Sequence, residues 1–434
     1  MSKYFRIYSI LFIIFILAGC SSKKVTVEGS GLQFTDKQTL DKINKGKAPF
    51  YGSSQLPASV DLSVKMPPPG NQGAQNSCVG WSIAYGMKSY QEKTARNWDV
   101  ASGESINKEH VFSPAFIYNQ INHGEDKGSH FADAFNIVKT KGVASLSKDP
   151  YDQSDFTSMP NSDAVTEAAN FKIAWAKTID PKDIEGIKSY LAKGYPVIIA
   201  VAFDQAFTDP AGPATVTSMD VNQGMGHAML IVGYDEGKQC LRIMNSWGTG
   251  WRDGGFCWIT YDAFKNCIRE CWIAKDEENK KEIKQGDEPQ IDNENPVVDE
   301  LLTGLVIKDV ENNSENPADR QSGKCLKIDG SVKLDNNYGD AARIVVFLNY
   351  DSGNPVLTAD EKYSYMGKEA AGYTEAIDLS GYNDQTKDFS IYIPYSALKI
   401  ENDKGSNLTA TPILFIDDFD ATDGKAISFK APGE

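Results

Sequence analysis

The stretch NQGAQNSCVGW, residues 71–81, decides the fold, because it places a glutamine, a glycine turn and a lone cysteine at the start of a helical pattern. Ser77 is a residue type that caps helices. Apolar residues recur behind it at helical spacing, at Ile83, Met87 and Tyr90. A thiol on the first turn of a helix faces unpaired backbone N–H groups and the positive end of the helix dipole. That environment favours thiolate, so the stretch predicts that Cys78 is a nucleophile.

A nucleophilic cysteine needs a base, and a second stretch supplies one. Residues 224–256, GMGHAMLIVGYDEGKQCLRIMNSWGTGWRDGGF, contain His227 and, further along, Asn245. Together the two stretches resemble the papain family of cysteine peptidases. The matching motifs, in the chain order of that family, are Gln72 ahead of Cys78, His227-Ala228 running into Val232-Gly233-Tyr234, and Asn245-Ser246-Trp247-Gly248 with Gly250-Trp251 behind it.

The resemblance implies an α+β fold with two lobes, a helical left lobe and a β-barrel right lobe, with the cleft between them. It also implies a role for each matching residue. Cys78 attacks a peptide carbonyl, and His227 gives its proton to the leaving amine. Asn245 orients the imidazole and Trp247 shields that hydrogen bond from water, while Gln72 and the Cys78 backbone N–H form the oxyanion hole. Such a mechanism requires neither a cofactor nor a metal.

Two glycines join the candidate site as substrate-binding positions. Gly226 directly precedes His227 at the end of a loop rich in glycine and proline. Gly128 falls near the place where relatives use paired glycines to bind the substrate backbone. For Gly128 two interpretations stay open, an ordinary turn glycine and a substrate contact.

The chain departs from the family signature around the nucleophile, where Gln75 and Val79 stand in place of a second cysteine and an aromatic residue. One disulfide of the family is therefore expected to be absent. The alternative function is a catalytically degenerate papain-like surface protein that binds a ligand through its C-terminal domain.

Composition limits the possible classes of function. The chain has 434 residues, 41% hydrophobic residues and a formal net charge of −15. That length allows a sizeable core and more than one domain. The negative charge, without a cluster of Lys and Arg, argues against a nucleic-acid partner. A polypeptide substrate is the expected partner.

Residues 1–20 carry Lys3 and Arg6 ahead of an apolar run and have the pattern of a secretory signal peptide. The ending Leu17-Ala18-Gly19-Cys20 resembles the lipobox of bacterial lipoproteins, in which the cysteine is lipidated and becomes the mature N-terminus. An ordinary signal peptide with an incidental cysteine is the alternative. Lipidation of Cys20 predicts an extracytoplasmic protein anchored to the membrane, at the outer membrane or cell surface in a cell that has two membranes.

Residues 21–55 are polar with one weak helical pattern, and a tether is favoured over a short inhibitory pro-segment. Residues 56–275 are expected to form the peptidase domain. Its left lobe should hold helices near 113–118 and 130–138. Its barrel should hold a helix capped by Asp180 with Pro181 at its first position, followed by strands at 196–203, 228–234, 240–245 and 255–261.

Residues 276–300 are rich in acidic residues and predict a solvated linker. Residues 301–434 contain short β-rich runs separated by Asn/Asp/Gly turns, which is typical of an immunoglobulin-like sandwich. The acidic run from Asp417 to Asp423 could hold calcium, but it lacks the spacing of a known loop, so turn chemistry is favoured. A surface protein or a glycan is a possible ligand of this domain.

The remaining cysteines are five: Cys240, Cys257, Cys267, Cys271 and Cys325. Outside the cytoplasm some of them should pair, so one or two disulfides are expected. Zinc is not expected, because Cys267 and Cys271 have no second matched pair of ligands.

Overall fold

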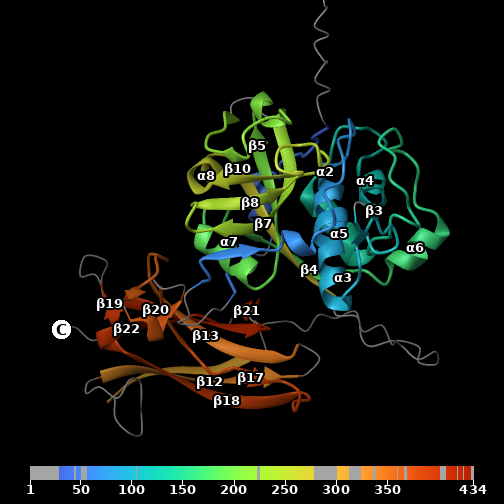
Figure 1. Cartoon of the computed structure of the whole chain (residues 1–434). Helices are drawn as coiled ribbons and strands as arrows, with labels where there is room; N and C mark the ends of the chain where they lie inside the picture. Colours follow the sequence, from blue (N-terminus) through green and yellow to red (C-terminus); the bar gives the residue numbers. More distant parts are fainter. Residues whose placement is uncertain are drawn as a thin grey trace, which may run out of the picture.

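The structure, a computed structural model, describes the chain in segments, and all statements below concern these. They are residues 29–43, 45–49, 56–103, 105–221, 225–277, 301–311, 324–335, 339–358, 360–365, 369–400, 407–417, 419–423 and 425–431. The predicted signal peptide, Cys20 and nearly all of the predicted linker lie outside them. Figure 1 shows a two-lobed domain above a β-rich domain. We call residues 56–277 the two-lobed domain and residues 301–431 the β-domain.

The central helix of the left lobe begins at the cysteine. It runs without interruption through α2 (Cys78–Gly80), a π-helical stretch η2 (Trp81–Lys88) and α3 (Ser89–Arg96). Every residue of α2 and η2 is buried, as the sequence predicted for the apolar positions. Ser77 stands at the N-cap without a side-chain capping bond, and its hydroxyl pairs instead with the Tyr151 hydroxyl at 2.8 Å. The predicted capping role of Ser77 is therefore wrong, although the helix starts where expected.

The other helices of the left lobe pack around this central helix. They are α4 (Pro114–Ile121), α5 (Phe131–Thr140) and α6 (Ser162–Ala168), with a small hairpin of β2 (Ala101–Ser102) and β3 (Ser105–Ile106) beside them. Ser113 caps α4 and Pro114 fills its first position, because proline has no N–H to leave unpaired there. The helices predicted near 113–118 and 130–138 are confirmed.

Among the described residues, eight strands form the sheet of the right lobe, in the order β4-β10-β5-β7-β8-β9-β6 with β1 paired to β7. Their bounds are Ser59–Asp61 (β1), Ile173–Ile179 (β4), Val197–Phe203 (β5), Thr215–Val216 (β6), Met225–Asp235 (β7), Cys240–Met244 (β8), Phe256–Thr260 (β9) and Ile268–Asp276 (β10). The predicted strands of this lobe are confirmed.

Strand β5 is buried along its whole length because its two faces serve two cores. Ile198 and Ala200 point to the core of the helical lobe, whereas Ile199 and Val201 point to the core of the barrel. This double burial explains why the strand reads as an unbroken apolar run rather than an alternating one.

The short helices of this lobe are α7 (Ile184–Ala192), α8 (Tyr261–Cys267) and two single turns, η1 (Ser63–Lys65) and η3 (Gln205–Thr208). Helix α7 begins later than predicted. The carboxylate of Asp183 accepts the Gly186 N–H at 2.9 Å and caps it, while Asp180 accepts the Lys182 N–H in a preceding turn. The predicted cap at Asp180 is therefore wrong by one turn.

The β-domain is built from two sheets that face each other across one apolar core. Side chains alternate along the strands, so that every second residue points inward. The smaller sheet contains β11 (Leu302–Glu311), β12 (Lys324–Leu334) and β18 (Gln385–Pro394). The larger sheet is centred on β13 (Ala341–Tyr350), β16 (Glu369–Tyr373) and β20 (Asn407–Ile416). Shorter elements complete it: β14 (Leu357–Thr358), β15 (Ser364–Tyr365), β17 (Ile377–Asp378), β19 (Leu398–Lys399), β21 (Phe419–Asp423), β22 (Ile427–Lys430), η6 (Glu361–Tyr363) and η7 (Tyr395–Ala397). The predicted all-β domain is confirmed.

The expected disulfides are absent from the two-lobed domain. No disulfide joins its described cysteines, which are Cys78, Cys240, Cys257, Cys267 and Cys271. Cys257, Cys267 and Cys271 lie in the barrel core among apolar side chains, where each packs as a small hydrophobic residue. Within the part of the chain that the structure describes, no helix is long and apolar enough to cross a membrane.

Candidate active site

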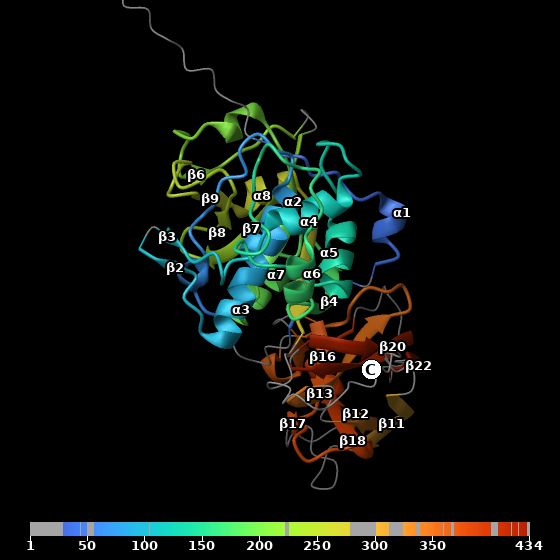
Figure 2. The ribbon, with the colours of Figure 1, turned by 90° about the vertical axis from the view of Figure 1, so that its right-hand side faces the viewer.

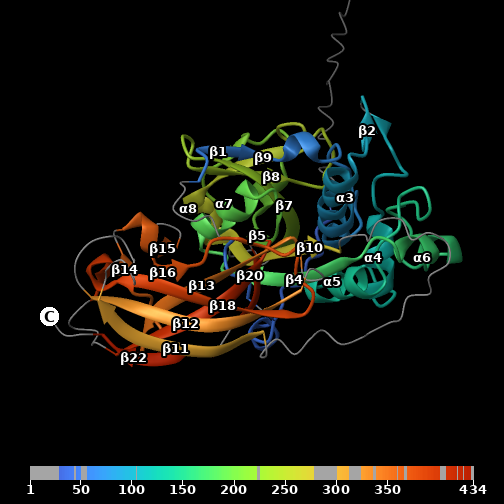
Figure 3. The same cartoon turned by 90° about the horizontal axis from the view of Figure 1, so that it is seen from below.

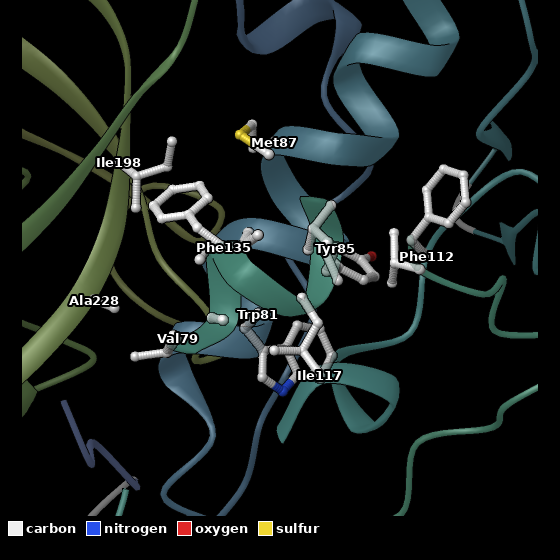
Figure 4. Close-up of a cluster of buried hydrophobic side chains, with 14 of the residues drawn as sticks. Val79, Trp81, Tyr85, Met87, Phe112, Ile117, Phe135, Ile198 and Ala228 are labelled. Atoms are coloured by element: carbon white, nitrogen blue, oxygen red, sulfur yellow. The ribbon is translucent and has the colours of Figure 1, made fainter. Parts of the chain in front are cut away.

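Cys78 lies at the junction of the two lobes, on the first turn of the central helix, and its side chain is fully buried. Strand β7 packs against this turn from the barrel side. Figure 4 shows Val79 and Trp81, which follow Cys78, in a buried apolar cluster with Ala228 of β7 nearby. Val79 is therefore a core residue, and its departure from the family signature is accommodated inside the lobe.

A hydrogen bond joins His227, near the start of β7, to Asn245, which directly follows β8. The His227 Nε2 atom lies 2.7 Å from Oδ1 of Asn245, so Nε2–H donates and Nδ1 is left as the acceptor of the neutral ring. Asn245 Oδ1 also accepts the Ser246 N–H at 2.8 Å, which fixes the amide. The Trp247 ring stacks on the imidazole, with centroids 4.6 Å apart and planes at 19°. Trp247 thus covers the hydrogen bond, at the place its predicted shielding role requires.

Gln72 is fully buried and held at both ends of its amide. Its Nε2 donates to the Gln75 carbonyl at 2.8 Å, and its Oε1 accepts the Ser246 hydroxyl at 2.6 Å. Its backbone is tied as well, because Gln72 N–H donates to the Ser246 carbonyl at 2.9 Å. The motifs that begin at Gln72 and at Asn245 are therefore physically joined, although 174 positions separate Gln72 from Ser246.

Gln75, which replaces a cysteine of the family signature, ties the turn before Cys78 to a loop of the left lobe. Its side-chain amide lies 3.3–3.4 Å from the carbonyls of Asp152, Gln153 and Asp155. Hydrogen bonds from this buried amide thus restrain the cysteine turn where the family signature has a second cysteine.

An extended part of the chain's own N-terminal region runs across Cys78, and we call residues 29–35 the cleft segment. On the left-lobe side, Ser129 N–H donates to the Gly31 carbonyl at 2.9 Å and Gln33 N–H donates to the Ser129 carbonyl at 3.0 Å. On the barrel side, Trp247 Nε1 donates to the Gly29 carbonyl at 3.0 Å. The favoured tether interpretation of residues 21–55 is wrong for this part, because the segment is clamped between the lobes.

The two candidate glycines mark where the cleft segment enters. Gly128 has φ +88° and lies directly against the Gly31 carbonyl, so a side chain there would collide with the segment. A Cβ added to Gly226 would lie 2.5 Å from the Leu32 carbonyl and 3.3 Å from the Phe34 ring. Both glycines therefore line a path for extended backbone past Cys78.

Two residues that the sequence did not single out hold the far part of the segment. Glu270, a buried carboxylate of β10, accepts the Thr35 N–H at 2.7 Å and the Thr35 hydroxyl at 3.0 Å. His130 Nδ1 lies 2.8 Å from the Gln33 carbonyl. The sequence marked neither residue, because β10 also carries Arg269, Lys275 and Asp276, and His130 belongs to no recognisable motif.

Burial shifts the pKa values of Cys78 and His227 toward the neutral forms of both groups. Burial raises the pKa of the Cys78 thiol to about 12, although backbone donors of Ala228, Val79 and Leu32 oppose the rise. Burial also lowers the pKa of His227 to about 4, against the effect of its bond to Asn245. In this conformation desolvation opposes both the thiolate of Cys78 and the imidazolium of His227. The reactive thiolate of Cys78 stays a prediction, and it belongs to a cleft that water can enter.

Comparison with known proteins agrees with this geometry. A family model described as papain family cysteine protease matches residues 56–278. Gamete and mating-type specific protein A of Dictyostelium discoideum is 32% identical over 126 residues, which are 29% of this chain and 27% of that protein. An uncharacterized peptidase C1-like protein of Acanthamoeba polyphaga mimivirus is 26% identical over 221 residues, 48% of this chain and 69% of that protein.

Among solved structures, xylellain, a cysteine protease from Xylella fastidiosa, is 21% identical, with a TM-score of 0.49 over 58% of this chain and 97% of that chain. The present chain spans only about a quarter of the Dictyostelium protein. The family model, by contrast, covers the whole two-lobed domain with both lobes and the cysteine helix. The chain therefore belongs to the papain family of cysteine proteases.

Proposed function

We propose that the protein is a membrane-anchored extracytoplasmic peptidase that hydrolyses peptide bonds through Cys78, His227 and Asn245, and that the described conformation is its latent state. The observation that carries this proposal is the cleft segment, an extended peptide lying on the thiol between Gly128 and Gly226. A cleft that already holds one extended backbone is suited to hold that of a substrate.

The proposed reaction uses the residues at these positions. Once the cleft is open and solvated, the thiolate of Cys78 attacks the substrate carbonyl carbon. Gln72 Nε2–H and the Cys78 backbone N–H receive the oxyanion, and imidazolium His227 protonates the leaving amine. His227 then takes a proton from water, which attacks the thioester and releases the acid. Asn245 keeps Nε2 engaged, so that Nδ1 is the nitrogen that exchanges protons.

Latency follows from the cleft segment in two ways. The segment excludes substrate sterically, since its backbone occupies the path between the two glycines. It also removes water from Cys78 and His227, and desolvation favours the neutral forms of both. Departure of the segment returns water to the pair and shifts both pKa values toward the ion-pair form.

The proposed location rests on the sequence alone. The apolar run and the ending Leu17-Ala18-Gly19-Cys20 support lipidation of Cys20, and Ser21 after the cysteine suits the outer membrane of a cell with two membranes. We further propose that the β-domain binds a surface protein or a glycan.

The test is covalent labelling of the chain from residue 21 onward with a peptidyl epoxide, followed by mass mapping of the modified residue. In the unmodified chain we expect slow modification, at Cys78 alone. Modification should be faster in Leu32→Asp, because a carboxylate does not suit the buried position of Leu32 beside Cys78. His227→Ala should not be modified. If Leu32→Asp is folded and its cleft open, yet Cys78 stays unmodified, the peptidase proposal fails. The alternative, a degenerate binding protein, would then be favoured.

A further inference from the structure

The larger sheet of the β-domain has two apolar faces, and only one of them belongs to the sandwich core. On β13, Ile344, Val346 and Leu348 point into that core. The intervening residues point the other way, toward the two-lobed domain, and form a second buried cluster with β20 and β15. Its members, which we call the outer cluster, are Val345, Phe347, Tyr365, Ala371, Ile413 and Phe415, none more than 5% exposed. Figure 3 shows β13 and β20 lying beside the two-lobed domain.

Part of what covers the outer cluster is the chain's own N-terminal region, residues 45–49, which we call the interdomain segment. Ala48 packs against the cluster, and the Tyr365 hydroxyl donates a hydrogen bond to the Ala48 carbonyl. Lys47 Nζ lies 4.7 Å from the centre of the Phe347 ring, a cation–π distance. Burial raises the pKa of Glu369, and the positive charge of Lys47 opposes this rise, so the two side chains are also near each other.

The other side of the interdomain segment is bound to the two-lobed domain. Gly46 N–H donates to the Thr178 carbonyl of β4 at 2.7 Å. The Tyr190 hydroxyl of α7 donates to the Lys47 carbonyl at 2.5 Å. A Cβ on Gly46 would lie 3.0 Å from that hydroxyl, so the fit is close. The segment is thus held from both sides, by one domain on each.

A short connection links the interdomain segment to the cleft segment. It consists of the one-turn helix α1 (Lys37–Leu40) and the residues after it, of which Leu40 and Ile43 pack against the core of the left lobe. Figure 2 shows α1 on the side of the left lobe near α5. The two domains are further joined by an ion pair between Lys275 Nζ and Asp417 Oδ2 at 2.9 Å. Contacts with both domains therefore hold the interdomain segment in place.

We propose that the β-domain is a latch for the cleft: by binding residues 45–49 through its outer cluster, it keeps residues 29–35 over Cys78. This inference rests on the proposed latent peptidase and goes beyond it, because it assigns the β-domain an intramolecular partner. It predicts that disturbing a contact far from the cleft opens the cleft.

The experiment compares rates of Cys78 labelling by the peptidyl epoxide in the chain from residue 21 onward. Lys47→Glu places a negative charge beside Glu369, and we expect labelling to accelerate about fivefold. The charge-exchanged double variant Lys47→Glu/Glu369→Lys should return the rate toward that of the unmodified chain. Tyr365→Phe, which removes one hydrogen bond, should accelerate labelling by about twofold to tenfold.

Matched controls lie on the other sheet of the β-domain. Lys327→Glu and Tyr392→Phe change the same residue types on β12 and β18, and we expect no change in labelling rate. A reference chain carries a site for a sequence-specific protease within α1. Cutting this site separates the cleft segment from the interdomain segment, and the cut chain gives the rate of Cys78 labelling without that connection.

The outcomes separate the two proposals. If the cut reference chain has lost the cleft segment and is still not labelled at Cys78, the peptidase proposal fails. If the cut chain is labelled rapidly, but Lys47→Glu and Tyr365→Phe behave like the controls, the latch is refuted and the peptidase proposal stands. Failure of the double variant to restore slow labelling would also count against the latch.

Discussion

Gln72 illustrates how one buried side chain connects the two motifs of the active site. Its amide is held by Gln75 on one end and Ser246 on the other, so the orientation of Nε2 is set before a substrate arrives. Preorganised donors of this kind stabilise charge that develops in the transition state, because they need no reorganisation when it forms. The same bonds make Gln72 part of the fold.

For Gln72→Ala in the cut chain, we expect turnover of a peptide substrate to fall by about 10²–10³. The free energy of unfolding should also fall by about 1–3 kcal/mol, because the Ser246 hydroxyl and the Gln75 carbonyl lose a partner. Steady-state kinetics and thermal unfolding measure the two effects. Gln385→Ala, a change at an exposed glutamine of β18 in the β-domain, is the control, and a similar loss of turnover there would contradict the assignment.

Asp149 makes the stability of the left lobe depend on pH. Burial raises the pKa of its carboxyl to about 6, against a hydrogen bond from Ser113 that lowers it and together with Asp155, whose charge raises it. Since the folded-state pKa exceeds the ordinary value of 3.8, this contribution to stability is fully present below about pH 4 and is lost as pH rises through about 6.

We therefore expect Asp149→Asn to unfold at a higher temperature than the unmodified chain at pH 7.5 and at the same temperature at pH 4. The gain should be about 1 kcal/mol, because the side chain is partly exposed and solvent screens the penalty. Thermal unfolding across this pH range provides the measurement. Equal gains at both values of pH would mean that burial of charge at Asp149 is not the cause.

At the scale of elements, the central helix is stabilised by an ionic network that pins it to the barrel. Lys88, fully buried in η2, is paired with Glu92 at 2.6 Å and with Asp276 at the end of β10. Arg96 pairs with the same glutamate one turn on. Breaking a buried pair is costly, because the remaining charge has no partner and no water.

Lys88→Met should lower the free energy of unfolding of the two-lobed domain by about 3–5 kcal/mol. Adding Asp276→Asn should recover part of that loss, since the Asp276 carboxylate loses its pair with Lys88, whereas Glu92 keeps its pair with Arg96. Urea unfolding, followed by tryptophan fluorescence, measures both. The comparison is Lys127→Met, which breaks an exposed pair with Glu125 and should cost less than about 1 kcal/mol. Equal costs for the two lysines would refute the importance of burial.

The sequence allowed elements to be predicted where their signals were local. The unbroken apolar run of β5 and the Ser113-Pro114 start of α4 are such signals, and both elements form as predicted. The start of α7 was misplaced because Asp180 and Asp183 are both residue types that cap helices, and the sequence alone does not distinguish them. Gln72, Cys78, His227 and Asn245 could be singled out because each motif is short and continuous.

The cleft segment could not be predicted in the same way. Residues 29–35 show neither helical nor strand periodicity, and their conformation depends on Ser129, Trp247 and Glu270, which are distant in sequence. The burial that shifts the pKa values of Cys78 and His227 likewise comes from tertiary packing, so the sequence did not reveal it. The outer cluster was likewise invisible, because an apolar residue on a sheet does not reveal which domain covers it.

At the scale of the whole molecule, the order of segments along the chain links latency to anchoring. The predicted lipid attachment at Cys20 precedes the cleft segment, and α1 follows it, with Lys37, Gln38 and Thr39 exposed. Exposed segments with few packed side chains are preferred sites of proteolytic cutting. One cut in α1 would therefore leave the cleft segment with the anchor and the peptidase domain with the latch.

We expect that such a cut, made at an engineered protease site in α1 of membrane-bound full-length protein, releases the peptidase and activates it together. The released fragment should appear in the soluble fraction and react rapidly with the peptidyl epoxide at Cys78, while the residues before the cut stay with the membrane. Cys20→Ala should be soluble before cutting, yet still need the cut for rapid labelling, because the cleft segment blocks the thiol without the lipid. A fragment that stays with the membrane and is slow to label would show that the segment remains in the cleft after the cut. A fragment that is released and yet stays slow to label would show that latency does not depend on the cleft segment.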